Sequence, residues 1–306
     1  MSQMTTRSTS TGHFELVIDG NTKPCYLKSI EGGFVKAGVI DEPIGVDLMR
    51  IKHTTVREVE PISAEMGLAG STEVLKWIKS SWKKEWSRRN GHIAHSNYDQ
   101  KSVVEQWYYD ALITETTFPS LDGTSKEASI LKIKFQPERV EIKPGDNKKL
   151  KEDIGTKQKM WQTAGFRLRI DGVDVTGTKK IESFTIKQGT KKVSVGNMRF
   201  PELEPTKVEF PTITAHIAHA HAAALTKWHN EFLVNKSADP AAERNGAIEF
   251  LAADKTQVLF TLKLSNVGLS SLSIPKSDGN QDALRMCKFE LYVGSMDIEG
   301  MGSGNE

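Results

Sequence analysis

A seven-residue segment near the N-terminus of this chain recurs once. Phe14–Gly20 reads Phe-Glu-Leu-Val-Ile-Asp-Gly and Phe166–Gly172 reads Phe-Arg-Leu-Arg-Ile-Asp-Gly, so five of seven positions are identical at a shift of 152 residues. Self-similarity at a fixed shift marks repeated structural units, and it constrains the fold more than any single motif does.

Further matches keep the same order along the chain. The shift stays between 151 and 156 residues for five more anchors: Ile30-Glu31 with Ile181-Glu182, Lys76-Trp77 with Lys227-Trp228, Arg89–Gly91 with Arg244–Gly246, Pro119–Gly123 with Pro275–Gly279, and Leu131–Phe135 with Cys287–Leu291. Each match alone is short, but matches in the same order from Phe14 to Phe135 predict a duplicated domain.

The alternation of apolar residues lapses between the two copies. Residues 143–159 contain six lysines, three acidic residues and the pair Pro144-Gly145, with almost nothing to bury, which is typical of a linker. We therefore expect one domain over 12–142, a Lys-rich linker over 143–162 and a second domain over 163–298. Flexible tails are expected over 1–11 and 299–306.

The composition excludes several classes of protein. Of the 306 residues, 38% are hydrophobic and 26% are charged, which is ordinary for a folded soluble chain and excludes disorder as the main state. The net charge of +2 is too balanced for a dedicated nucleic-acid binder. No apolar run approaches the ~20 residues of a membrane span, and the first residues lack a signal peptide's apolar core. We expect a chain made in the cytoplasm, with Cys25 and Cys287 as free thiols.

Each copy is rich in segments with the two-residue alternation of a β-strand. We expect strands at 14–18, 26–30, 49–59, 91–96, 103–112 and 129–142, and in the second copy at 166–170, 180–186, 207–214, 247–252, 258–265 and 286–298. The segments 34–49 and 189–204 are expected to be loops or hairpins. Such antiparallel sheets tend to close, because open edges pair uncontrollably. The predicted fold is mainly β, with two tandem β-barrel or sandwich domains that carry one helix each.

One segment of each copy has the 3.6-residue period of a helix. In the first copy Ser71 is a candidate N-cap, and the apolar stripe consists of Val74, Ile78, Trp82 and Trp86. Arg88-Arg89 and Asn90-Gly91 are the candidate end of this helix, with cations in the last turn and a glycine stop. The second copy repeats the stripe with Ile217, Leu225, Trp228 and Phe232. We expect both stripes, with Trp77 beside the first, to pack into the core.

The sequence contains no convincing catalytic or cofactor site. His216, His219 and His221 cluster with His229 nearby, but on a helix His221 would point about 140° away from His219, which is poor geometry for a metal site. The chain has no nucleophile elbow and no phosphate loop. We therefore predict no catalytic residue, no cofactor and no metal, and expect a protein that is not an enzyme.

In this order of elements each copy resembles the tail-tube proteins of contractile phages and of phage-derived injection systems. The similarity rests on the opening strand, on Ser29–Gly33, on the Trp-bearing segment Glu73–Ile78, on Arg-Asn-Gly before a strand pair, and on the strand Lys132–Phe135 after Pro-x-x-Asp-Gly. The resemblance implies a β-barrel flanked by a helix, six of which form a ring by side-to-side sheet extension, and rings that stack into a hollow tube. It also implies that segment 34–49 carries a hairpin that reaches the next ring.

Two departures from the usual family pattern shape the functional hypothesis. The chain carries two copies, and the second has Ser183-Phe184 in place of the Gly-Gly pair of the first. If both copies take ring positions, three chains fill six positions, so we predict a tail-tube ring that is a trimer with approximate six-fold symmetry. The expected partners are copies of the chain, neighbouring rings, and sheath or baseplate proteins, with DNA or an effector passing through the lumen. The expected location is a virion or injection particle assembled in the cytoplasm.

Two alternatives remain open at this point. The same domain could build a tube initiator, a baseplate hub or a terminator. A chain of another class, a two-domain β module that binds carbohydrate or protein, would need exposed aromatic rings, for which Trp107, Tyr108 and Tyr109 are the candidates. Because these three residues are consecutive, a strand must send at least one ring outward.

Overall fold

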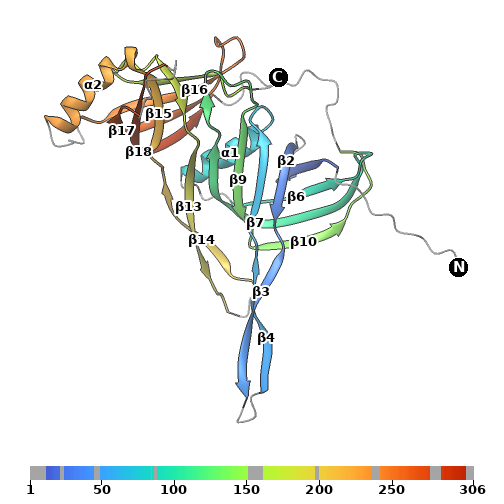
Figure 1. Cartoon of the computed structure of the whole chain (residues 1–306). Helices are drawn as coiled ribbons and strands as arrows, with labels where there is room; N and C mark the ends of the chain where they lie inside the picture. Colours follow the sequence, from blue (N-terminus) through green and yellow to red (C-terminus); the bar gives the residue numbers. More distant parts are fainter. Residues whose placement is uncertain are drawn as a thin grey trace.

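The structure is a computed structural model of the whole chain (Figure 1). It describes residues 12–20, 24–44, 49–83, 85, 88–150, 161–196, 200–235, 242–275 and 284–300. The expected N-terminal tail, all but two residues of the expected C-terminal tail, and Trp86 lie outside the described residues.

The N-terminal half is built mainly from strands. Its elements are β1 (Phe14–Ile18), β2 (Cys25–Gly32), β3 (Val35–Ile44), β4 (Met49–Val59), β5 (Ile62–Gly67), α1 (Thr72–Trp82), β6 (Arg89–Ser96), β7 (Ser102–Phe118), β8 (Leu121–Asp122), β9 (Ile130–Gln136) and β10 (Arg139–Pro144). Asp19 and Gly20 follow β1 with φ of 50° and 70°. This is the left-handed turn that an Asp-Gly pair predicts, and glycine adopts it without strain.

Six of these strands close into a barrel. Their order is β1-β2-β5-β9-β7-β6, all neighbours are antiparallel, and β6 returns to β1. The long strand β7 allows this closure because its first part pairs with β6 and its last part with β9. β10 continues along β7 after a break at Pro137. The hairpin of β3 and β4 projects from the barrel (Figure 1).

The C-terminal half repeats this order of strands in an open sheet. Its elements are β11 (Phe166–Ile170), β12 (Thr178–Ile181), β13 (Phe184–Val193), β14 (Glu202–Glu209), β15 (Ile213–Ala218), η1 (His219–His221), α2 (Ala223–His229), η2 (Asn230–Val234), β16 (Arg244–Leu251), β17 (Val258–Ser273) and β18 (Met286–Glu299). The sheet order is β11-β16-β17-β18-β15-β12. In the part of the chain that the structure describes, β11 and β12 do not pair as strands, so this sheet is a half-barrel.

The duplication predicted from the sequence is confirmed strand by strand. Asp110 and Asn266 both have a positive φ, of 50° and 56°, at a shift of 156 residues. Cross-strand pairs recur at the shifts seen in the sequence: Lys36–Glu58 as Lys187–Glu209, and Ile113–Phe135 as Leu269–Leu291. Residues on the strands and helix of one half therefore have defined equivalents in the other, at a shift of 152 on the first strand, 151 from there to the helix, and 155 or 156 after it.

The apolar stripe of each helix lies in the core, as predicted. Val74, Ile78 and Trp82 are buried, and the Trp77 side chain is 1% exposed, with its ring 5.4 Å from that of Phe135 on β9. In the second half Leu225, Trp228 and Phe232 are buried in the same way. An amphipathic helix on a sheet accounts for both stripes, since its lysines occupy the opposite face.

The predicted end of the first helix is wrong. α1 ends at Trp82, and Arg89, Asn90 and Gly91 belong to β6. Glycine is required at Gly91 because a Cβ atom there would lie 2.1 Å from the carbonyl oxygen of Val17 on β1. Ser71 does precede the helix, but its hydroxyl donates to the Leu68 carbonyl oxygen at 2.9 Å and does not cap the helix.

Strand boundaries around the helices also differ from the prediction. Ile217 lies on β15, and α2 begins only at Ala223. The single strand expected over 207–214 is the end of β14 and the start of β15, separated at Pro211, which has no backbone N–H to continue a ladder. β5 was not predicted. Segments 34–49 and 189–204 contribute strands to the hairpins β3–β4 and β13–β14.

Candidate assembly interface

The two halves of the chain are joined by pairing between their strands. β13 adds to the end of β7, from the pair Phe184–Phe118 to the pair Lys187–Glu115. The hydroxyls of Thr185 and Thr117 meet there at 2.8 Å. In return β8 adds to β12. Each half thus extends the sheet of the other, and we call this contact the internal joint.

Aromatic side chains fill the internal joint. Phe118 at the end of β7 is fully buried, and its ring stacks on that of Phe184 with centroids 5.3 Å apart. The same ring lies 6.1 Å from that of Phe250 and 6.3 Å from that of Trp82. Since Trp82 belongs to the first half and Phe250 to the second, the two halves share one apolar core.

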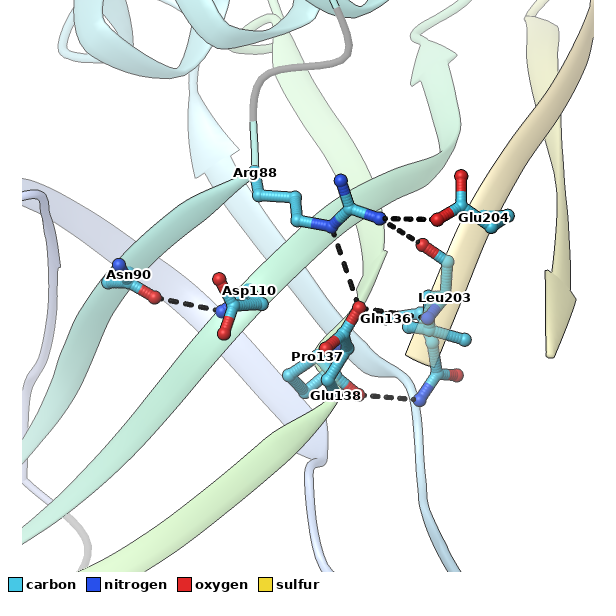
Figure 2. Close-up of polar contacts among 8 residues, drawn as sticks. All are labelled: Arg88, Asn90, Asp110, Gln136, Pro137, Glu138, Leu203 and Glu204. Carbon is cyan, nitrogen blue, oxygen red and sulfur yellow. Dashed lines mark hydrogen bonds and ion pairs between the residues drawn. The ribbon is translucent and has the colours of Figure 1, made fainter. Parts of the chain in front are cut away.

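A polar cluster holds the far end of the β13–β14 hairpin against the first half (Figure 2). Nη2 of Arg88 donates to the Leu203 carbonyl oxygen at 2.6 Å and lies 3.3 Å from a carboxylate oxygen of Glu204. Glu138 accepts a hydrogen bond from the Leu203 amide at 2.8 Å and lies 3.5 Å from Nε of Arg88. We call this cluster the Arg88 clamp. It ties β14 of the second half to two parts of the first half: Arg88, which directly precedes β6, and Glu138, which lies between β9 and β10.

The helix of the first half also touches the sheet of the second. Lys79 on α1 donates to the Ile298 carbonyl oxygen of β18 at 2.6 Å. Asp297 lies 3.9 Å from the Lys79 ammonium and 3.5 Å from that of Lys83. Ion pairs this exposed contribute little stability, so they mainly define how the helix sits on the neighbouring sheet.

The three aromatic residues considered as a binding surface, Trp107, Tyr108 and Tyr109, are covered by other parts of the protein. Tyr108 is fully buried and its hydroxyl donates to the Val17 carbonyl oxygen at 3.1 Å; burial raises the pKa of this phenol. The other two rings point outward, as the alternation predicts, but cations of β10 lie over them, with Lys143 4.6 Å from the Trp107 centroid and Arg139 4.1 Å from that of Tyr109. This arrangement disfavours a sugar-stacking surface.

The clustered histidines do not share one helix. His216 lies on β15, where its Nε2 is 2.8 Å from a carboxylate oxygen of Glu182, and His219 and His221 are exposed on a 3₁₀ turn. Among the described residues, no group of three or more His, Cys, Asp or Glu side chains is placed to hold a metal ion.

The absence of a metal remains a prediction. Because His216 lies on a strand and is engaged by Glu182, whereas His219 and His221 lie on a 3₁₀ turn, we expect elemental analysis of untagged, chelator-free protein to find no stoichiometric zinc, nickel or copper. One equivalent of any of these metals would contradict the prediction.

Both cysteines are buried free thiols, as predicted. Burial raises the pKa of the Cys25 thiol to about 12, so this group stays protonated and unreactive at neutral pH. The helices of the described segments are too short or too polar to cross a membrane.

A closed β-barrel and a half-barrel with the same strand order, each with a flanking helix, are joined edge to edge within the chain, which defines a mainly β protein with a duplicated domain. Comparison with protein families supports this class. The profile of the family described as "T4-like virus tail tube protein gp19" matches residues 11–141 and again residues 162–297. The chain belongs to this family of structural tail tube proteins and carries its domain twice, which confirms the resemblance read from the sequence.

Solved structures that are similar to part of this chain include chains of an extracellular contractile injection system and of an anti-feeding prophage, and Hcp1 from Flavobacterium johnsoniae. One, from the structure "Extracellular Contractile Injection System, PVC sheath-tube complex in extended state", is 20% identical, with 46% of this chain and 94% of that chain covered and a TM-score of 0.41. A chain of the anti-feeding prophage tube terminating cap is 18% identical, with coverages of 47% and 97% and a TM-score of 0.38. Hcp1 from Flavobacterium johnsoniae is 16% identical, with coverages of 44% and 96% and a TM-score of 0.30. A search of curated proteins gives no match.

Proposed function

We propose that the chain is a ring subunit of a phage tail tube or of the tube of a phage-derived injection system, and that both halves occupy ring positions. The observation that carries this proposal is the internal joint, in which β13 and β8 each extend the sheet of the other half. The joint uses different surfaces of the two halves, and a contact of this kind, when repeated, closes into a ring or runs on as a filament. Three chains then supply six positions.

We also propose domain limits of 12–142 and 163–298, with 143–162 as the connection. The ends of this connection are ordered. Lys143 and Pro144 complete β10, and Leu150 is buried. Trp161 stacks on Phe260 of the second half at 5.7 Å, and its carbonyl oxygen accepts a hydrogen bond from Ser129 of the first. The connection therefore helps to hold the internal joint in place.

The proposed role is structural and non-enzymatic. The β3–β4 hairpin, which projects from the barrel (Figure 1), is the part that we assign to contact with the next ring. Sheath or baseplate proteins are the proposed outer partners, and assembly takes place in the cytoplasm before the particle is complete.

Native mass spectrometry and electron microscopy of the purified chain test this proposal. We expect rings of about 102 kDa, three times the 34.0 kDa of one chain, with approximate six-fold symmetry in projection. Stacked tubes would support a position in the shaft, and single rings would support the tube initiator, hub or terminator. A ring of six chains would contradict the trimer, and monomers at all concentrations would contradict the structural role.

A further inference from the structure

We infer that each chain carries a second joint that is unformed in the single chain. In it, β3 of one chain adds to the free edge of β17 in the next chain, and Lys52 and His53 on β4 face Glu243. This inference rests on the proposed function, and it names the residues that join one chain to another. The partner is a second copy of this chain.

The duplication itself points to this joint. The internal joint places β13 of the second half on β7 of the first; the equivalents are β3 and β17. On one side β17 pairs with β18 as far as Ser273, but on the other side β16 pairs with it only up to Val267. The rest of that edge has no partner among the described strands. The β3–β4 hairpin likewise forms a two-stranded sheet of its own.

Exposed apolar side chains occupy the positions that the internal joint buries. Ile186 on β13 is 1% exposed, but its equivalent Val35 on β3 is 45% exposed. Phe118 is 0% exposed, but its equivalent Ile274 is 50% exposed.

β18, which α1 touches through Lys79, shows the same contrast with its equivalent β10. Ile298 is 0% exposed and its equivalent Ile142 is 56% exposed. Exposed apolar residues that cluster on one interface indicate a contact surface, and here each of the three has an equivalent that is already buried in the joint between the two halves.

The charge at the Arg88 position of the clamp is reversed at the second joint. In the clamp Arg88 belongs to the half that receives the hairpin, and Glu204 belongs to the hairpin itself. The equivalent of Arg88 is Glu243, at a shift of 155, and the equivalent of Glu204 is His53, with Lys52 beside it at a shift of 151. Both Lys52 and His53 are exposed, and Glu243 is held by a hydrogen bond from the Tyr292 hydroxyl at 2.9 Å. Lys52 therefore brings a positive charge to Glu243, whereas His53 lies 3.7 Å from a carboxylate oxygen of Glu42 in its own hairpin.

The second strands of the two hairpins differ in charge, although each hairpin as a whole has a net charge of +1 because β3 contributes −1 and β13 contributes +3. β14 has Glu202, Glu204 and Glu209 against Lys207, a net charge of −2, whereas β4 has Arg50, Lys52 and Arg57 against Glu58, a net charge of +2. Another contact of the internal joint, between Lys192 and Glu58 at 2.9 Å, does not favour the second joint, because its equivalents are two acidic residues, Asp41 and Glu209, of which Asp41 is paired with Arg50 at 3.2 Å.

The charges at the clamp positions favour alternation of the two halves around a ring. If the first hairpin displaced the second from the internal joint, Lys52 would face Arg88. If the second hairpin bound the β17 edge, Glu204 would face Glu243. Like charges in contact oppose both arrangements, so at the positions of Lys52 and Glu204 each hairpin favours the other half.

Disulfide trapping tests the register of the second joint. Directly opposite residues on neighbouring strands lie close enough for a disulfide. The internal pair Thr117–Thr185 corresponds to Ser273–Phe34, so Phe34→Cys with Ser273→Cys should cross-link one chain to the next and give covalent species of up to three chains. Thr117→Cys with Thr185→Cys is the matched control, which should cross-link within one chain. The native Cys25 and Cys287 are buried and should not interfere.

Charge reversal tests the electrostatic part. Glu243→Lys should raise the concentration needed for ring formation about tenfold or more, and Lys52→Glu with His53→Glu in the same chain should restore it. Glu231→Lys, an equal change of charge on an exposed residue of η2, is the control and should leave assembly unchanged. A melting temperature close to that of the wild type shows that each variant folds.

The outcomes separate this inference from the proposed function. If the wild type forms rings, but Phe34→Cys with Ser273→Cys gives only single chains and Glu243→Lys assembles normally, the inference is wrong and the ring proposal stands. Efficient cross-linking of Phe34→Cys with Thr117→Cys between chains would also overturn it, since like halves would then be neighbours. If the wild type forms no ring under any condition, the proposed function itself fails.

Discussion

Replacing Trp77 with alanine should lower the free energy of unfolding by about 3–5 kcal/mol, the usual cost of truncating a large buried aromatic side chain. Its indole is 1% exposed and packs between α1 and β9, near the Phe135 ring. Trp228→Ala should have an effect of similar size, because Trp228 is the equivalent residue on α2 and is 3% exposed.

Chemical denaturation followed by circular dichroism measures both effects. Tyr98→Ala is the control, since Tyr98 is 84% exposed and its truncation removes no core contact. If either tryptophan variant unfolded at the same denaturant concentration as the wild type, its ring would not belong to the core, and the packing of that helix on its sheet would need revision.

Shortening the β3–β4 hairpin should abolish tubes and leave the fold intact. Lys36 and Glu58 are a cross-strand pair, so residues 37–57 can be replaced by Asn-Gly, the two-residue turn that best suits a hairpin. The deleted part pairs only within itself among the described strands and projects from the barrel (Figure 1). Its exposed apolar residues, Val39, Ile40, Ile51 and Val56, have no role in the core.

Electron microscopy and thermal unfolding report on the two parts of this prediction. We expect a melting temperature near that of the wild type and neither stacked tubes nor stable rings, because the deletion also removes Lys52 and His53 of the second joint. Tubes of ordinary length from the shortened chain would contradict the assignment of the hairpin to ring stacking. A large fall in melting temperature would instead show that the hairpin stabilises the body of the protein.

The fold class was predictable because the strongest signals in the sequence are periodic. Apolar alternation predicted the strands, and the stripe of Val74, Ile78 and Trp82 predicted a helix against a sheet; the structure confirms both. The end of that helix was not predictable from local rules. Arg-Asn-Gly has the composition of a helix stop, but Gly91 is a strand residue that lets β6 approach β1.

The internal joint was beyond the reach of local patterns. Nothing in the sequence of β13 says that it pairs with β7 of the other half, because the same alternation would serve any neighbouring strand. The Arg88 clamp is equally hidden, since Arg88 and Glu204 are 116 positions apart. A signal was nevertheless present: equivalent positions of the two copies differ in charge, with Arg88 against Glu243 and Glu204 against His53.

The covalent link between the two halves changes how a ring of this kind would nucleate. The internal joint forms within one molecule, where the local concentration of the partner surface is far above that of free protein in a cell. In a ring of three chains, half of the six joints are then complete as soon as each chain has folded. Ring closure depends on roughly the third power of protein concentration, whereas six separate subunits would require the sixth. Such a chain could start rings at dilutions where a single-domain relative stays dispersed.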